Sequence, residues 1–508
     1  MKPLIPAASY IKEWTKRSLF TGLLLGLLFA IANTYLGLKV GMTVSASIPS
    51  AVIALALFKS FSKKGTVLEM NLVQTIASVG EGIASGVIFT IPALFILGEQ
   101  VALWRTVLLG ILGGVLGILF MIPMRRYIIV REHKVLPFPE GTACAQILKD
   151  STSLQKGGFL AFKAFLAAIF FRLGSAIFSL WKQEVAISFP FLPKAIFSIE
   201  CSPAILGVGT LIGYRISSIM LAGSLLAWAV LVPLISLFLD FPIQHAYGHI
   251  EMDGQEIWSK YLRYIGIGAV GVGGIFSLIK TLPLVWETVH SSIKELFSAS
   301  RNGENSKRTE KDIPLRWLVW GSLAIILILY LTPSLGFNLT TILILVALGF
   351  FFVIVTSLTV GLVGSTSSPI SGMTLATLLV TCAIFVSLGW TERVYLISAL
   401  TMSVVVNVSI SLAGTTSQDL KTGYLLGATP FFQQVGELVG VVLPAIGVAF
   451  TLLALQQIAP FGSKILPAPQ GAMMALVAQG VMEKNLPVLL VFLGAILGCI
   501  VALLRIPI

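Results

Sequence analysis

The chain has 508 residues, of which 56% are hydrophobic and 11% are charged. Soluble globular domains carry about 25% charged residues, so this composition excludes a soluble enzyme, and it also excludes a disordered chain. The formal net charge of +12 would suggest nucleic acid as a partner of a soluble protein, but in a membrane protein it indicates basic cytoplasmic loops. The four cysteines lie singly in apolar runs and no HExxH motif occurs, so the sequence indicates no metal site and no cofactor.

Apolar runs long enough to cross a bilayer recur along the whole chain. A spanning helix needs about 20 mostly apolar residues, and about 14 such helices can be placed. They lie near residues 19–38, 42–58, 80–98, 103–122, 159–180, 201–217, 219–239, 261–284, 316–333, 341–363, 372–389, 394–413, 434–455 and 486–505. The sequence therefore predicts an all-α polytopic membrane protein with additional broken or re-entrant helices.

One polar segment divides the chain. We expect a cytoplasmic N-terminal segment at 1–18, a first transmembrane half at 19–286, a cytoplasmic linker at 287–314 and a second transmembrane half at 315–508. Cytoplasmic loops are rich in lysine and arginine, and the basic loops fall on the side of the N-terminus if the spans alternate. The N-terminus is therefore expected in the cytoplasm, with the chain in the cytoplasmic (inner) membrane.

The first segment with functional potential is 33–43, NTYLGLKVGMT, where glycines interrupt an apolar span. A helix break inside a membrane is tolerated only against protein or a watery cavity. Asn33 and Tyr35 would then be hydrogen-bonding groups for a substrate. A glycine-rich external turn is an equally good interpretation.

The second segment is 71–90, NLVQTIASVGEGIASGVIFT, which carries Gln74, Ser78 and Glu81 into a span. No basic residue follows Glu81 until Arg105. A carboxylate in such a place needs a partner, a proton or water, which suits a proton carrier. Tight glycine packing with Glu81 at an interface is the alternative.

The third segment is 136–148, LPFPEGTACAQIL, which is too short and too rich in proline to span. A re-entrant or hairpin element is expected, with Glu140 near a helix start, where the helix dipole stabilises a carboxylate. Its counterpart in the repeat described below is Gln470, so one copy alone has a titratable group. This difference favours a proton role for Glu140 over simple capping.

The fourth segment is 413–430, AGTTSQDLKTGYLLGATP. It offers hydrogen-bonding groups and both signs of charge, as a zwitterionic substrate would need, through Gln418, Asp419, Lys421 and Tyr424. An ordinary polar loop is the alternative. Glu437, further along the chain, is expected to be an interface anchor.

An internal repeat is indicated by three matches at an offset of about 330 residues. Gly41-Met42-Thr43 recurs at 372–374, Asn71 corresponds to Asn407, and LPFPEG at 136–141 recurs as LPAPQG at 466–471. The loops 59–64 and 123–134 hold seven lysines and arginines, whereas their counterparts hold two. This difference predicts an inverted-topology repeat, an architecture of transporters. The second copy is expected to be incomplete, because residue 178 already corresponds to Ile508.

Taken together, several segments resemble the oligopeptide transporter family. They are NTYLGLKVGMTVSASIPSAVI, NLVQTIASVGEGIASGVIFTIPAL, LPFPEGTACAQIL, SPAILGVGTLIGYR, YIGIGAVGVGGIFSLIK, SGMTLATLL, AGTTSQDLKTGYLLGATP and LPAPQGAMMALVAQGV. The resemblance implies a bacterial-type secondary transporter that couples proton entry to the movement of small peptides, glutathione-like compounds or metal chelates. It also implies a chain truncated at its C-terminus.

The sequence thus predicts proton-coupled import of oligopeptides, not catalysis, with Glu81 and Glu140 as the proton-coupling groups. The expected substrate ligands are Asn33, Tyr35, Gln74, Gln418, Asp419, Lys421 and Tyr424. The expected partners are a small peptide or chelate, protons and the lipid bilayer, with no nucleic acid. A siderophore-like metal-chelate transporter stays open, as does half of a split or decayed transporter completed by a separate chain. Self-association also stays open.

Overall fold

The computed structural model describes residues 3–60, 65–149, 307–484 apart from 366, 367 and 369, and 487–503. Between 163 and 283 it describes mainly 184–188, 191–201, 203–239 and 253–270. In these ranges nine helices have the length and composition to cross a membrane. The protein is therefore an all-α multi-pass membrane protein in its main architecture. Most of the expected span at 159–180 and of the end of that at 261–284 lies outside the described residues. So do most of the expected linker and the basic loop residues Lys63 and Lys64.

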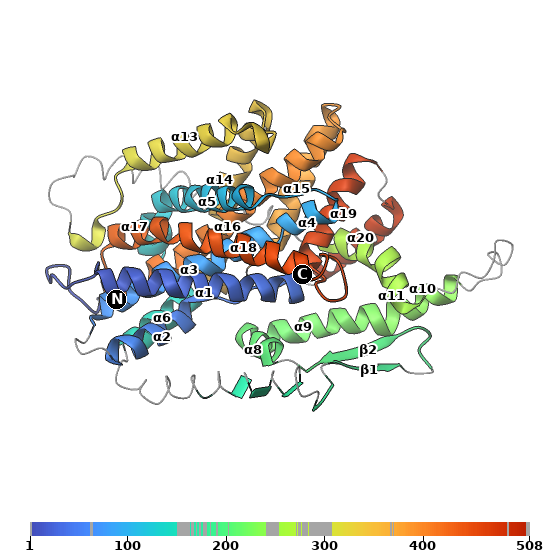
Figure 1. Cartoon of the computed structure of the whole chain (residues 1–508), viewed down its shortest axis with the longest axis horizontal. Coiled ribbons are helices and arrows are strands. Elements are labelled where there is room, and N and C mark those ends of the chain that lie inside the picture. The colour runs from blue at the N-terminus through green and yellow to red at the C-terminus, as the bar shows by residue number, and fades with distance from the viewer. Residues whose placement is uncertain are drawn as a thin grey trace. The chain divides into compact units, whose positions relative to one another are not determined.

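The chain forms two compact units, of which the first comprises residues 1–159 and 277–485. Its helices are α1 (Lys16–Val40), α2 (Ser47–Ser60), α3 (Val67–Ile88), α4 (Ile91–Ile96), α5 (Leu103–Met121), α6 (Pro139–Lys149), α13 (Leu315–Leu331), α14 (Leu339–Val363), α15 (Ile370–Ser387), α16 (Arg393–Leu426), α17 (Pro430–Gly440), α18 (Val442–Ile458) and α19 (Pro469–Met482). Within this unit α3 packs against α1, α16 and α18, and α5 packs against α16 (Figure 1).

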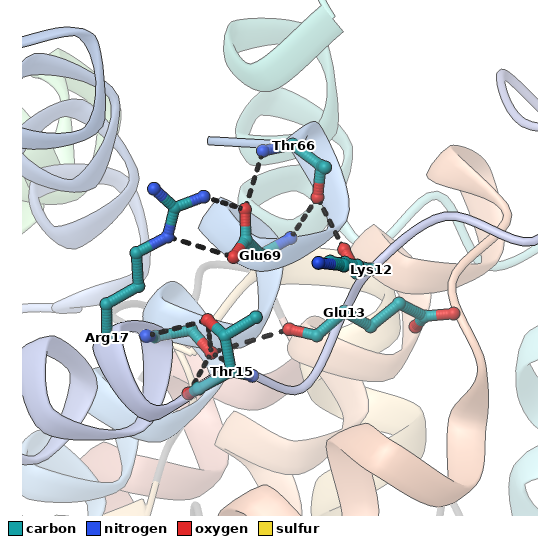
Figure 2. Close-up of polar contacts among 7 residues, drawn as sticks. Lys12, Glu13, Thr15, Arg17, Thr66 and Glu69 are labelled. Atoms are coloured by element: carbon teal, nitrogen blue, oxygen red, sulfur yellow. Dashed lines mark hydrogen bonds and ion pairs between the residues drawn. The ribbon is translucent and has the colours of Figure 1, made fainter. Parts of the chain in front are cut away.

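The starts of α1 and α3 are capped and joined to each other (Figure 2). Thr15 and Thr66 accept backbone N–H groups of the first turns of α1 and α3, which satisfies donors that a helix start leaves free. The Glu69 carboxylate accepts two hydrogen bonds from the guanidinium of Arg17, at 3.0 and 2.6 Å. This bidentate pair fixes the two helices side by side at one end.

The central helix α16 is much longer than the expected span at 394–413. It has 34 residues, and every residue from 398 to 423 is buried. Its many serine and threonine hydroxyls are tolerated because several donate to carbonyls one turn earlier, as Ser403 and Ser417 do. The segment 413–430 is therefore mostly helix, and the interpretation as an ordinary polar loop is wrong.

Two proline-containing segments adopt the same local conformation. Phe138 and Ala468, which occupy equivalent places in LPFPEG and LPAPQG, both have positive φ, at 48° and 42°. The Phe138 N–H donates to the carbonyl of Gly361 near the end of α14, and the Ala468 N–H donates to that of Leu38 near the end of α1. A short helix, α6 or α19, starts at the next residue, where proline is favoured.

The ends of α1 and α14 match as well, which corrects one sequence match. Both helices have 25 residues and are followed by a glycine of positive φ, Gly41 or Gly364. Gly372, in contrast, lies inside α15. Gly41 therefore corresponds in its structural role to Gly364, and the three-letter match with 372–374 does not mark equivalent positions.

The second unit comprises residues 160–276 and 486–508. Its elements are β1 (Glu184–Ser188), β2 (Ile196–Glu200), α8 (Pro203–Ile212), α9 (Tyr214–Leu225), α10 (Val232–Leu239), α11 (Gly254–Ile257) and α20 (Val488–Leu503). The strands form an antiparallel hairpin that pairs Glu184 with Glu200, a feature absent from our sequence prediction. The compact units thus cut across the two halves expected from the sequence, and those halves remain a prediction.

Close helix packing in the first unit depends on Gly80. A Cβ atom at this position of α3 would lie 2.0 Å from the carbonyl oxygen of Gly26 in α1. Because this oxygen belongs to the backbone, it cannot rotate away from the clash as a flexible side chain could. We expect Gly80→Ala to destabilise the fold by about 1–3 kcal/mol, the usual cost of overpacking.

Thermal unfolding in detergent checks this expectation. Gly223→Ala in α9 is a matched control, since nothing lies within 4 Å of a Cβ atom there. That control should unfold at the wild-type temperature or slightly above it, because alanine has the higher helix propensity. Equal midpoints for Gly80→Ala and the wild type would contradict the close approach of α1 and α3.

Candidate functional site

Asp419 is the centre of a buried polar cluster that joins three helices. Its carboxylate accepts hydrogen bonds from the Ser78 hydroxyl at 2.5 Å, from the Ser47 hydroxyl at 3.3 Å and from the Gln74 side-chain amide. Gln74 and Ser78 lie one turn apart on α3, and Ser47 is the first residue of α2. The position at the start of α2 favours negative charge, because the helix dipole is positive there.

Glu81 lies on α3 close to this group. Its Oε2 accepts the backbone N–H of Ala46, 3.4 Å away, just before α2 begins. Glu81 is buried and interacts electrostatically with both Asp419 and Glu140. Among the described residues no basic side chain forms an ion pair with Glu81 or Asp419.

Glu140 and Gln418 meet at the start of α6. Glu140 lies in the first turn of α6, where the Ser365 hydroxyl donates to its Oε2. The neighbouring Gly141 N–H donates to Gln418 Oε1 at 2.7 Å, and Gln418 Nε2 donates to the Val360 carbonyl at 3.1 Å. Gln418 of α16 thereby ties α6 to α14 directly beside Asp419.

Lys421 does not face Asp419. Its Nζ donates to the backbone carbonyls of His133 and Leu136, at 3.1 and 3.0 Å, and lies 5.3 Å from the centre of the Phe138 ring. Tyr424 lies against the ring of His133 in the same region. These two residues therefore support the loop before α6 in this conformation, and Lys421 forms no ion pair with Glu81 or Asp419 among the described residues.

Asn33 and Tyr35 lie on different faces of α1. Asn33 is buried, and its Oδ1 accepts the Val44 N–H at 2.8 Å, so it holds the irregular segment between α1 and α2. Tyr35 is 42% exposed and continues the outward stripe of Leu24, Leu28 and Ile31. Helical periodicity places Tyr35 away from the buried cluster, and we do not include it in the proposed site.

The arrangement brings together carboxyl groups from α3, α6 and α16, which repel one another electrostatically. For the two that are buried, Glu81 and Asp419, no ion pair occurs among the described residues, and buried charges of this kind are stable only when protons or cations neutralise them. The described residues contain no group of three or more metal-ligating side chains. Ionisable groups buried in membrane helices commonly mark functional sites, so this cluster is the candidate site.

The family model described as "OPT oligopeptide transporter protein" matches residues 13–508. The chain belongs to the oligopeptide transporter family. This membership makes it a multi-pass membrane transporter, as the resemblance of its segments implied.

Individual relatives agree with this assignment. The transporter is 33% identical over 512 residues to a Haemophilus influenzae protein named as an oligopeptide transporter, covering 92% of this chain and 78% of that relative. It is 24% identical to a Saccharomyces cerevisiae protein that is also named as an oligopeptide transporter, and that alignment covers 97% of this chain and 85% of the relative. A metal-nicotianamine transporter of Arabidopsis thaliana is 23% identical, and the alignment covers 57% of this chain and 48% of that relative.

Of the residues expected from the sequence, Gln74, Glu81, Glu140, Gln418 and Asp419 meet in or beside the buried cluster of the transporter. Glu437 was missed as a core residue. It is fully buried in α17, which excludes the expected role as an interface anchor. A single glutamate in an apolar run gives no signal of its depth, and only helix packing shows it.

Asn71 is a second unexpected feature of the transporter. It lies one turn before Gln74 and Thr75 on α3 and is buried, yet within the described parts of the chain neither its Nδ2 nor its Oδ1 has a hydrogen-bond partner. Gln74 Oε1 is also without a partner. Buried polar atoms are nearly always paired, so these two amides are candidates for contact with a ligand.

Proposed function

We propose that the transporter couples the entry of protons to the import of oligopeptides across the cytoplasmic membrane, with its N-terminus in the cytoplasm. The observation that carries this proposal is the pair of buried carboxyl groups Glu81 of α3 and Asp419 of α16, with the partly buried Glu140 nearby in the first turn of α6. Ionisable groups inside a membrane are costly and commonly mark proton pathways.

Substrate binding is assigned to the polar groups around this centre. Asn71 and Gln74 have side-chain atoms without partners, and a peptide backbone offers both donors and acceptors to amides. Asn33, Gln418, Lys421 and Tyr424 fix the segments that border the cluster, and they would reach a substrate after the helix ends move apart. Asp419 belongs to both assignments, since it contacts Gln74 and interacts with Glu81.

The proposal includes an inverted repeat, a division of the chain near the 287–314 segment, and further membrane spans outside the described residues. The inverted repeat is supported by the matching conformations at Phe138 and Ala468. It is also supported by the hydrogen bonds that join the start of α6 to α14 and the start of α19 to α1. Inverted repeats place the substrate at their interface. The proposal concerns the single chain.

Uptake by the purified transporter in proteoliposomes tests the function. A labelled mixture of short peptides and a ferric chelate are supplied separately under an inward proton gradient. Peptide accumulation that a protonophore abolishes supports the proposal. Uptake of the chelate alone would support the second candidate, a metal-chelate transporter, which the similarity to the Arabidopsis thaliana relative favours.

Glu81→Gln and Glu140→Gln test the coupling groups. Each is expected to lower proton-driven uptake roughly tenfold or more, because a typical coupling free energy corresponds to about 5- to 150-fold. Counterflow exchange, which needs no net proton movement, should persist. Glu99→Gln is a control, since Glu99 forms an exposed pair with Arg393. Unchanged uptake in both cluster variants would remove these residues from the mechanism.

A further inference from the structure

Glu437 is a buried carboxyl group outside the site described so far. It lies in α17, near the end of that helix, and is fully buried. Its Oε2 accepts a hydrogen bond of 2.8 Å from the Thr416 hydroxyl of α16, and its Oε1 has no partner among the described residues. One oxygen of this carboxyl group is therefore unsatisfied in a buried position.

The helices around α17 bring no basic group to Glu437. They are α1, α3, α5, α16 and α18. Asp419 of α16 is the titratable group that acts on it electrostatically, and this interaction is repulsive. Four basic groups of these helices have other partners: Arg17 binds Glu69, Arg393 binds Glu99, Arg105 binds Thr401, and Lys421 binds backbone carbonyls. The remaining two, Lys16 and Lys39 at the ends of α1, form no ion pair with Glu437 among the described residues.

One turn before Glu437, α17 contributes Gln434 to a separate, neutralised charge group. Gln434 donates to Asp312, and Arg125 and Arg126 pair with the same carboxylate. No ion pair from this group extends to Glu437. A carboxylate at 437 would thus be an uncompensated buried charge, which proteins avoid by neutralising the group.

We propose that Glu437 is a further proton-binding site of the transporter, linked to Asp419 through Thr416. Thr416 and Asp419 lie three residues apart on α16 and hence on neighbouring positions of one face. A shift of α17 against α16 that exposes Oε1 to water would release the proton. This assignment rests on the proposed proton-coupled function. It adds a carboxyl group that lies outside the proposed substrate contacts and away from the starts of α2 and α6.

A proton fits this position better than a metal cation does. A hard cation such as Ca²⁺ or Mg²⁺ requires six or more oxygen ligands. In the described part of the chain the hydrogen-bond partner of the Glu437 carboxyl group is the Thr416 hydroxyl, and no group of three or more metal-ligating side chains occurs there. A neutral carboxylic acid needs no such shell.

Two measurements on the full-length protein test the proposal, with Glu437→Gln as the variant and the exposed Glu392→Gln as its control. The first is infrared spectroscopy of the carboxylic-acid carbonyl stretch during a titration of the purified protein kept above about pH 6, where exposed carboxyl groups such as Glu392 are already ionised. Glu437→Gln should lose one such band, and the control should lose none. Thr416→Val keeps Glu437 but removes its hydrogen bond, so the band should shift; this variant decides the question if Glu437→Gln does not fold.

The second measurement is the number of protons taken up per peptide in proteoliposomes that contain a pH-sensitive dye, with the same peptide mixture. Glu437→Gln should lower this ratio while counterflow exchange persists. An unchanged infrared titration together with an unchanged ratio would overturn the assignment, as would uptake that follows a sodium gradient and ignores pH. Failure of the wild type to take up peptide or chelate would reject the proposed function, whereas the infrared band would still decide whether Glu437 binds a proton.

Discussion

Asp419→Asn is expected to abolish most proton-driven uptake while the protein stays folded. Asp419 accepts hydrogen bonds from Gln74, Ser78 and Ser47, so removal of its charge changes the electrostatic balance of the whole buried cluster. We expect a decrease of about 5- to 150-fold, the range of typical coupling free energies. The initial rate of peptide uptake under an inward proton gradient is the measurement.

The fold should survive this substitution because the neighbours can adapt. Asparagine presents an NH₂ group where Asp419 presents an oxygen, and that group needs an acceptor. Gln74 Oε1 has no partner among the described residues. If the Gln74 side-chain amide rotates by half a turn, this oxygen can accept the hydrogen bond from the asparagine NH₂ group, and the serine hydroxyls can rotate as well. Thermal unfolding near the wild-type temperature is therefore expected, in contrast to that of Gly80→Ala.

Two controls separate coupling from binding. Counterflow exchange of labelled peptide should persist in Asp419→Asn if the residue acts in coupling, and it should fail if the residue is chiefly a substrate ligand. Asp419→Glu keeps the charge and should retain more uptake than the asparagine variant. Wild-type uptake in Asp419→Asn would exclude Asp419 from both roles.

Much of the cluster could be predicted because helical spacing is visible in sequence. Gln74, Ser78 and Glu81 are four and three residues apart, so they share one face of a helix whatever it packs against. The prolines and glycine of LPFPEG likewise predicted an interruption with Glu140 near a helix start, and α6 begins at Pro139. These features depend on local chemistry alone.

Contacts between distant segments could not be predicted in this way. Lys421 has the charge expected of a carboxylate ligand, but the carbonyls of His133 and Leu136 surround it because the loop before α6 packs there. The described part of the expected linker is packed as well: Arg308 is buried and Asp312 binds two arginines. A polar segment is exposed to solvent only where the fold brings no hydrogen-bonding or charged partner to its side chains. Whether such a partner is present depends on the packing of distant segments.

Arg308→Met is expected to cause the largest loss of stability among the substitutions considered. The guanidinium of Arg308 donates to Glu13 at 2.7 Å, to Thr429 at 3.0 Å and to the Gly427 carbonyl at 2.8 Å. The side chains of Arg308 and Glu13 are only 7% and 4% exposed. Removal of one partner of a buried pair typically costs about 3–5 kcal/mol, because the other charge remains without compensation.

The exposed pair of Arg393 and Glu99 provides a matched control with the same chemistry, since these side chains are 64% and 26% exposed. Arg393→Met should change the unfolding free energy by about 0–1 kcal/mol.

The double variant Glu13→Gln/Arg308→Met should recover much of the loss, because it removes the uncompensated carboxylate while glutamine still accepts the Thr429 N–H that Glu13 accepts at 2.8 Å. Denaturant unfolding of the four proteins in one detergent checks both expectations. Equal losses of unfolding free energy in Arg308→Met and in the double variant would contradict the role of the uncompensated Glu13 charge. They would show instead that Arg308 stabilises the fold through its hydrogen bonds to Gly427 and Thr429.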